Sequence, residues 1–249
     1  MAGAGLNAAA AEPPSRATIE ITVYKLRNTP DNQRQRLTQF FEKTWIPAMH
    51  RAGSGPIGVF ANSIGPDGPF LMTLTSYPNM GAFEQTRDKL AADSGFAQAL
   101  HAFNSQPGLA FERAERSLLR GFPSMPNIEV PAGDAKRPSR IFEIRQYESN
   151  NLSTLARKID MFGKGEIAIF RRLGMQPVFF GEMVVGTRMP NLVYMLSYED
   201  LAARDKAWRA FGADPEWQKM RVTPGWADAE IVSNITNFIV SPLGFSEIR

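Results

Sequence analysis

The chain has no cysteine among its 249 residues and only two histidines, His50 and His101. Without cysteine it can form no disulfide, no thiolate nucleophile and no cysteine-ligated zinc site. Two histidines are too few for a three-histidine metal site. No apolar run reaches the roughly 18 residues that a membrane-spanning helix needs. The sequence therefore predicts neither a metal site nor a membrane segment.

Charge of one sign is not concentrated anywhere in the chain. Lysine and arginine number 28 and aspartate and glutamate 25, and the net charge of +3 is spread without a basic block. A nucleic-acid-binding surface more often shows a basic stripe with interleaved aromatic side chains, so we expect no nucleic-acid partner. Hydrophobic residues make up 43% of the chain, which is enough for a buried core and excludes a disordered protein.

The first residues, MAGAGLNAAAAEPPSR, are small and apolar up to Glu12 and lack an early positive charge. Two interpretations stay open for residues 1–16. They are the remnant of a trimmed signal peptide, in which case the protein is exported or periplasmic, or a disordered leader of a cytoplasmic protein. In both cases we leave them out of the fold.

The chain contains an internal repeat. Residues 53–96 and 174–217 align without a gap at a constant offset of 121. Ten of these 44 positions are identical, whereas chance would give roughly 5–7%. The identical pairs include Gly53 with Gly174, Tyr77 with Tyr198 and Asp93 with Asp214.

Each copy shows the same order of expected elements. In the second copy we predict a strand over 140–147, a helix over 152–173 and a hairpin over 177–198. A helix over 200–211 and a long strand over 229–240 follow. The predicted segments are a leader at 1–16, an N-terminal domain at 17–122, a Pro-rich linker at 123–139 and a C-terminal domain at 140–249.

This order is β-α-β-β-α-β, the ferredoxin-like motif, in two tandem copies. The helices cover one face of each sheet, so the other face needs a partner. We predict an α+β fold in which the two copies pack sheet to sheet as a barrel with the helices outside. Since one chain holds both copies, a monomer can close the barrel, and free edge strands leave room for a homodimer or a larger homo-oligomer.

The stretch GADPEWQKM at 212–220 places two carboxylates beside an indole and invites interpretation as an active site. The order of Asp214, Pro215 and Glu216 is also typical of a helix N-cap, a proline at the first helical position and an acidic first turn. We favour the cap, with Trp217 packing into the core.

Several stretches together resemble the NIPSNAP family: the strand IFEIRQY, the hairpin end LVYMLSYEDLAAR, the turn ADPEWQK and the closing FIVSPL. The resemblance covers both halves and implies the dimeric α/β-barrel superfamily. Related barrels include haem-degrading and antibiotic-biosynthesis monooxygenases, chlorite dismutases and polyketide cyclases. Some NIPSNAP proteins are described as adaptors. The resemblance therefore implies a fold but no single activity.

The first strand of the second copy, RIFEIRQY, offers candidate catalytic residues. Phe142 and Ile144 share one face of this strand, and Glu143, Arg145 and Tyr147 share the other. We expect the apolar face to pack against the helices. The polar face would then line the barrel and present Glu143, Arg145 and Tyr147 to a ligand.

The first copy offers Lys25 and Arg27 at the matching place, at an offset of 118 residues. An inward pair of Arg27 and Arg145 would bind a carboxylate, a phosphate or an enolate. The alternative is a buried pair of Arg145 with Glu143 that only balances charge.

Four more residues are candidate ligand contacts. Glu182, on an apolar strand, is either a base with a raised pKa or a solvent-facing residue. Tyr194 either donates a hydrogen bond into a cavity or fills the core. Asn237 could supply a site amide. His50 lies near the C-terminal end of a helix, where a cation is favoured, so it also has a structural interpretation. Haem is the one cofactor alternative, and His50 and His101 are the only candidates for its axial ligand. Otherwise we expect no cofactor.

Two functions remain open. The first is a small-molecule barrel that binds or transforms a small organic molecule, an anion being one option, without a metal. Its chemistry would be like that of a cofactor-independent monooxygenase or an isomerase. It predicts an inner cavity lined by the residues named above. The second is a non-catalytic interaction or adaptor protein, which predicts a filled barrel and an exposed apolar patch.

Overall fold

The computed structural model describes residues 15–132 and 140–249, so the expected leader at 1–16 lies almost wholly outside the described residues. In each half the strands and helices follow the predicted order β-α-β-β-α-β. The strands are β1 (Thr18–Lys25), β2 (Ile57–Ile64), β3 (Phe70–Tyr77), β4 (Arg113–Gly121), β5 (Ile141–Glu148), β6 (Gln176–Val185), β7 (Asn191–Tyr198) and β8 (Asn234–Pro242).

In each half a long helix follows the first strand, and it contains one π-helical turn. The helices are α1 (Gln33–Phe40), η1 (Phe41–Trp45), α2 (Ile46–Ala52), α3 (Met80–Ala92) and α4 (Ser94–Asn104) in the N-terminal half, and α5 (Leu152–Met161), η2 (Phe162–Glu166), α6 (Ile167–Arg172), α7 (Leu201–Ala213), α8 (Pro215–Met220) and α9 (Asp228–Ile231) in the C-terminal half.

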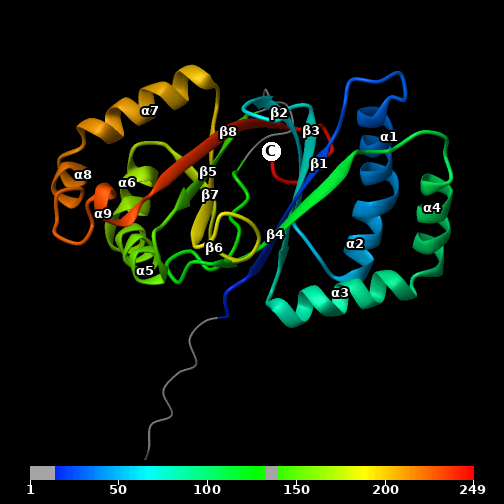
Figure 1. The fold of residues 1–249 in the computed structure, drawn as a ribbon, viewed down its shortest axis with the longest axis horizontal. Coiled ribbons are helices and arrows are strands. Elements are labelled where there is room, and N and C mark those ends of the chain that lie inside the picture. Colours follow the sequence, from blue (N-terminus) through cyan, green and yellow to red (C-terminus); the bar gives the residue numbers. More distant parts are fainter. Residues whose placement is uncertain (1–14, 133–139) are drawn as a thin grey trace, which may run out of the picture.

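The strands form one closed antiparallel barrel in the order β1-β3-β2-β8-β5-β7-β6-β4. The two halves meet at two seams, β2 with β8 and β4 with β6. Helices α1 to α4 lie on one side of the barrel and α5 to α9 on the other (Figure 1). The predicted fold class is confirmed, and the seams show that the two sheets join edge to edge by backbone hydrogen bonds.

The first strands of the two halves correspond at an offset different from the predicted one. Thr18 pairs with Tyr77 as Ile141 pairs with Tyr198. Since Tyr77 and Tyr198 are 121 residues apart, the first strands are offset by 123 residues, not 118. Glu20 is therefore the counterpart of Glu143, and Arg27 is not the counterpart of Arg145.

Three apolar clusters fill the molecule. One draws its strand residues from both halves, including Ile19, Phe60, Phe142 and Val240, and it fills the barrel. The other two join the strands of each half to its helices. Burial of such large side chains stabilises by about 1.5–3 kcal/mol each.

The last strand begins later than the sequence predicts. Strand β8 starts at Asn234, and Asp228–Ile231 forms the short helix α9 instead. Asp228 and Glu230 lie in the first turn of α9, where acidic side chains favour a helix. Ile231 closes the helix fully buried in the cluster under the C-terminal helices, so packing outweighs the β-propensity of the following residues.

The predicted cap at GADPEWQKM is confirmed. Asp214 Oδ1 accepts hydrogen bonds from the backbone N–H groups of Glu216 at 3.0 Å and Trp217 at 3.1 Å. Its carboxylate also pairs with Arg172 Nη1 at 2.8 Å, and Trp217 is buried in the core. The first half repeats this arrangement with Asp93, which caps α4 and pairs with Arg51.

Replacing Asp214 with alanine is expected to lower the melting temperature by roughly 2–4 °C. One cap typically contributes about 1 kcal/mol to the free energy of unfolding, and a loss of that size shifts the melting temperature by roughly this amount in a chain of this length. Differential scanning calorimetry measures the shift. Asp88→Ala on the exposed face of α3 is the matched control and should leave the melting temperature nearly unchanged. An Asp214→Ala protein that melts with the control would contradict the role of the cap.

Candidate functional site

The polar face of β5 lies under the helices of the C-terminal half. Phe142 and Ile144 belong to the cluster that fills the barrel, whereas Tyr147 belongs to the cluster beneath the helices. Glu143 and Arg145 share the helix-facing side with Tyr147, because side chains alternate along a strand. The prediction that these residues line the barrel is wrong. Apolar side chains from every strand fill the interior of the barrel. On the other face of the sheet, helix α7 supplies polar partners for Glu143.

Glu143 is a fully buried carboxylate surrounded by donors from four elements, β5, β7, β8 and α7. Burial alone would raise the pKa of its carboxyl, but the hydrogen bond from Arg204, the charge of Arg145 and the hydrogen bonds from Trp208 and Asn237 outweigh burial and hold the pKa below its usual range. The donors to its two oxygens are Arg204 Nη2 at 2.6 Å, Trp208 Nε1 at 2.8 Å, Arg145 Nη1 at 3.0 Å, Asn237 Nδ2 at 3.2 Å and the Tyr198 hydroxyl at 3.4 Å.

Arg145 links this carboxylate to two tyrosines. Its guanidinium lies 4.4 Å from the centre of the Trp208 ring and donates from Nε to the Tyr147 hydroxyl at 3.3 Å. The Tyr194 hydroxyl donates to the same Tyr147 oxygen at 2.9 Å. Burial raises the pKa of Tyr194 well above its usual value, so its phenol keeps its proton. We call Glu143, Arg145, Tyr147, Tyr194, Tyr198, Arg204, Trp208 and Asn237 the Glu143 cluster.

A second buried charge group lies beside it. Lys158 on α5 is 1% exposed, and its Nζ lies 3.1 Å from Glu166 and 3.3 Å from Asp228. Burial would lower the pKa of Lys158, but the two carboxylates raise it, so the lysine stays a cation. Burial raises the pKa of Glu166. Asp228, which is half exposed, gives the ammonium a second carboxylate partner.

The N-terminal half builds the same scaffold without this second group. The π-helical turns η1 and η2 begin 121 residues apart, so Lys158 and Glu166 correspond to Leu37 and Trp45. Leu37 packs in the apolar cluster of its half, and Trp45 packs against that cluster. The first half therefore builds the same helical segment without these buried charges, which cost desolvation free energy.

The Glu143 position, in contrast, keeps its carboxylate in both halves. Glu20 is buried, accepts a hydrogen bond from the Tyr77 hydroxyl at 2.7 Å and pairs with Arg116 at 2.6 Å. Tyr77 corresponds to Tyr198. Only the C-terminal half surrounds this carboxylate with two arginines and an indole.

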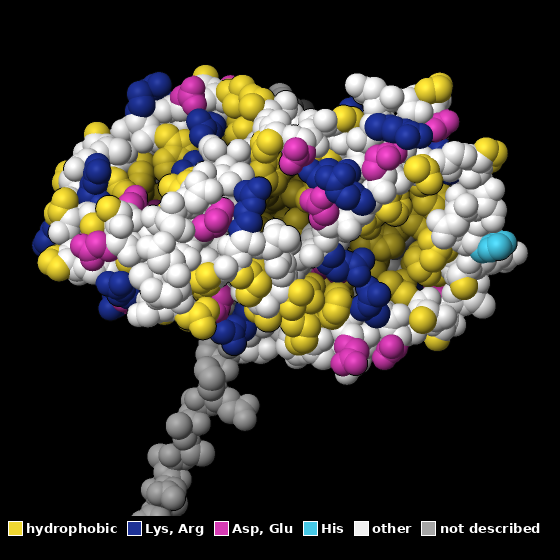
Figure 2. Space-filling view, in the orientation of Figure 1, with side chains coloured by type: hydrophobic (Ala, Val, Ile, Leu, Met, Phe, Trp, Pro, Cys, Tyr) yellow, Lys and Arg dark blue, Asp and Glu magenta, His cyan; other side chains and the backbone are white. Residues whose placement is uncertain are grey.

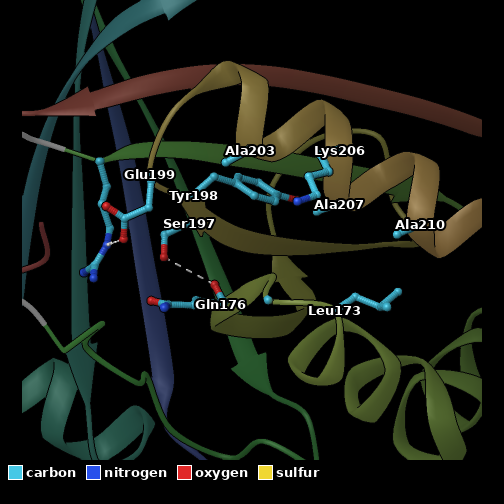
Figure 3. A pocket seen from close by; sticks show the side chains of 11 residues that line it. Leu173, Gln176, Ser197, Tyr198, Glu199, Ala203, Lys206, Ala207 and Ala210 are labelled. Carbon is cyan, nitrogen blue, oxygen red and sulfur yellow. Dashed lines mark hydrogen bonds and ion pairs between the residues drawn. The ribbon is translucent and has the colours of Figure 1, made fainter.

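A cleft of about 250 Å³ opens between α7 and the end of α6 (Figure 3). Tyr198 joins it to the Glu143 cluster, since its ring lines the cleft while its hydroxyl reaches Glu143. The base of the cleft lies at the end of α6, and its wall is the alanine-rich side of α7. The lining residues are Arg140, Leu173, Gly174, Gln176, Ser197, Tyr198, Glu199, Ala203, Lys206, Ala207 and Ala210.

In the N-terminal half, side chains occupy the corresponding place. The Lys89 ammonium donates to the backbone carbonyl of Ala52 at 3.1 Å, and Thr86 shares a hydrogen bond of 2.9 Å with Ser54. In the C-terminal half, Ala210 and Ala207 stand at the positions that Lys89 and Thr86 occupy in the N-terminal half. A methyl group added at Gly174 would meet nothing within 4 Å, whereas at Gly53 it would meet the Lys89 ammonium at 3.8 Å.

The other predicted site residues lie elsewhere. Lys25 approaches Asp67 and the Phe70 ring, and Arg27 pairs with Glu112 at 3.2 Å. Glu182 pairs with Arg120 across the β4–β6 seam, and His50 pairs with Glu247 near the end of the chain. None of them joins the Glu143 cluster, and the predicted inward pair of Arg27 with Arg145 is wrong.

Sequence reasoning identified part of the Glu143 cluster and missed the rest. It named Glu143, Arg145, Tyr147, Tyr194 and Asn237, and the structure brings these five together. It missed the residues that the helices and the end of β7 contribute. A comparison of the two copies would have identified Lys158. It occupies a position on the apolar side of its helix, and the first copy has Leu37 at that position. Within the Glu143 cluster the missed residues are Tyr198, Arg204 and Trp208, and in the second charge group they are Lys158, Glu166 and Asp228.

Residues 15–132 and 140–249 contain neither a candidate metal site nor a candidate membrane-spanning helix. No group of three or more histidine, aspartate or glutamate side chains there is arranged to hold a metal ion. No helix of this part is long and apolar enough to cross a membrane. On the face shown in Figure 2, basic and acidic side chains are interspersed.

Known structures share the fold over almost the whole chain. A "putative monooxygenase" from Lactobacillus acidophilus NCFM has 12% identity and a TM-score of 0.57, covering 91% of this chain and 94% of that one. A "putative monooxygenase" from Fusobacterium nucleatum subsp. nucleatum has 5% identity and a TM-score of 0.58, covering 92% and 93%. An anthrone oxidase-like protein has 11% identity and a TM-score of 0.54, covering 92% of each. At these identities the likeness shows the fold alone.

Sequence comparison identifies the family. No curated protein matches the chain. The NIPSNAP family profile matches it twice, over residues 19–125 and 142–247, once in each structural repeat. These two matches cover most of the sequence, and the chain therefore belongs to the NIPSNAP family.

Proposed function

We propose that this protein binds a small organic molecule in the cleft beside α7, with the Glu143 cluster behind Tyr198. The comparison between the two halves carries the proposal. The same scaffold fills this place with Lys89 and Thr86 in one half and leaves it lined by Ala210 and Ala207 in the other. A space that the fold can fill and does not fill is a candidate binding site.

The lining suits a small ligand. Binding pockets for drug-sized molecules enclose about 300–1,000 Å³, so a cleft of about 250 Å³ fits a smaller one. Alanine methyl groups and Leu173 form an apolar wall, and Gln176, Lys206 and Glu199 place polar groups around it. This combination of an apolar surface with a few polar groups is typical of small-molecule sites.

The Glu143 cluster fixes one wall of this site. Tyr198 donates its hydroxyl hydrogen to Glu143, and the carboxylate is held in turn by Arg204 and Trp208 of α7. The cluster thereby locks α7 and the Tyr198 ring in one arrangement, and a preorganised wall lowers the cost of binding. As an extension of this proposal, the protein converts the ligand without a metal, by chemistry of the kind for which a monooxygenase or an oxidase among the fold relatives is named.

Closing the cleft tests the proposal. Ala210→Lys introduces the side chain that fills the corresponding place in the first half, so binding of small organic fragments in the cleft should be lost. The measurement is a fragment screen by NMR on protein with labelled alanine methyl groups, read at Ala203 and Ala207. Ala202→Lys adds the same charge on the exposed side of α7 and serves as the matched control. If no fragment shifts these methyl signals in the unmodified protein, or if Ala210→Lys binds as well as the control, the proposal fails.

A further inference from the structure

We propose that the ligand of this cleft is a small amino acid or a related zwitterion, with a primary ammonium group at one end and a carboxylate at the other. This inference rests on the proposed function and names its ligand class. Two differences between the halves support it, one for each charged group.

The ammonium group is inferred from the missing lysine. In the first half the Lys89 ammonium lies on the carbonyl of Ala52, at the C-terminal end of α2. Helix C-termini carry partial negative charge and favour a cation there. In the second half the corresponding carbonyl belongs to Leu173, and Ala210 has no amine to offer it. Ala210 and Leu173 lie across the cleft from each other, so a ligand ammonium between them would take the place of the absent one (Figure 3).

The carboxylate is inferred from an added lysine. Lys206 lines the cleft one helical turn before Ala210, and the residue at its position in the first half is the neutral Gln85. Arg140, the other cation of the lining, is already bound to Glu199 and to the carbonyls of Ala132 and Arg249. Lys206 is therefore the cation that suits a ligand anion.

The two changes fit one ligand. The second half has lost a cation from the end of the cleft and gained one a turn away along α7. A molecule that carries a cation and an anion separated by a short apolar chain matches both positions, and the methyl groups of Ala203 and Ala207 lie beside such a chain. A purely anionic ligand would leave the Leu173 carbonyl without its cation, and a purely cationic one would face Lys206.

Three probes of equal chain length distinguish these cases. 4-Aminobutanoate carries both charges, butanoate lacks the ammonium and butylammonium lacks the carboxylate. We expect 4-aminobutanoate to bind about tenfold tighter than either of the others, since a charged hydrogen bond contributes about that factor or more. Titrations are followed by NMR at the Ala203 and Ala207 methyl groups.

Variants assign each charge to its residue. Lys206→Gln should remove the preference for 4-aminobutanoate over butylammonium, and Ala210→Lys should abolish binding of 4-aminobutanoate. The triple variant Gln85→Lys with Thr86→Ala and Lys89→Ala transfers the open cleft and both charge changes to the first half and should raise the stoichiometry from one to two. Thermal melts confirm that each variant is folded, and the transfer variant leaves the original cleft untouched.

The outcomes separate this inference from the proposed function. If butanoate binds as tightly as 4-aminobutanoate, or if Lys206→Gln leaves the preference unchanged, the ligand class is wrong. Uncharged 1-butanol or other fragments that still bind the unmodified protein, and not Ala210→Lys, would then leave the proposed function standing. If no probe or fragment binds, both are overturned.

Discussion

Glu143→Ala is expected to lower the free energy of unfolding by about 3–5 kcal/mol, the usual cost of removing one partner of a buried ion pair. The substitution leaves the Arg145 guanidinium, which is nearly buried, without its carboxylate. It also removes the acceptor of the Trp208 indole N–H. Urea denaturation followed by tryptophan fluorescence measures the loss.

The first half supplies the matched control for this prediction. Glu20 occupies the same place in its half, but its partner Arg116 is about half exposed and can turn to solvent. Glu20→Ala should therefore cost distinctly less than Glu143→Ala. Equal losses from the two substitutions would show that the arginines around Glu143 add nothing beyond the common scaffold.

The same residue predicts a pH dependence. The pKa of Glu143 lies below its usual value, because hydrogen bonds from Arg204 and the charge of Arg145 outweigh the opposing effect of burial. Such a carboxyl stabilises the fold above the ordinary glutamate pKa of about 4.3, and this contribution is lost as the pH falls through the lower folded value. The difference in unfolding free energy between the unmodified protein and Glu143→Gln should therefore shrink between pH 5 and pH 3, and a constant difference would contradict it.

Lys158→Met is expected to have an effect of similar size, about 3–5 kcal/mol, because it leaves the buried Glu166 without its nearest cation. The double variant Lys158→Met with Glu166→Met should recover most or all of this loss, since apolar residues often replace a buried ion pair at no cost. The first half supports this expectation, because apolar side chains, Leu37 and Trp45, pack at the corresponding positions there. Urea denaturation compares the three proteins.

An exposed pair on the same helical segment is the control. Lys164 pairs with Asp160 at the surface, and Lys164→Met should change the stability by less than about 1 kcal/mol. If the double variant at 158 and 166 stays as unstable as Lys158→Met, the buried charges are a requirement of folding. If it recovers, their presence in this half needs a functional explanation.

The sequence predicts the fold well because the relevant signals are local and doubled. The offset of 121 residues, the alternating strands and the cap at Asp214 each depend on neighbouring residues, and every signal occurs twice. The error at the first strand arose from a gap: an alignment at 118 pairs Arg27 with Arg145, whereas the strand register pairs Thr22 with Arg145. Register depends on hydrogen bonds to a distant strand, which a single strand sequence does not reveal.

The site was less predictable for the same reason. Alternation along β5 correctly separates Phe142 from Glu143, but it does not tell which face meets the barrel. That depends on what the helices present, and Arg204 and Trp208 lie about 60 residues away in the sequence. The cleft is harder still to foresee, because it is defined by small side chains, and only the comparison of Ala210 with Lys89 makes them meaningful.

The closure of the barrel by two seams within one polypeptide has an evolutionary consequence. A barrel assembled from two identical chains would inherit every substitution twice, and a cleft opened in one subunit would open in the other. Here a codon change reaches one repeat alone. The first repeat can continue to supply strand edges and apolar packing under purifying selection for stability, while the second accumulates buried charges and small side chains that would be too costly in duplicate.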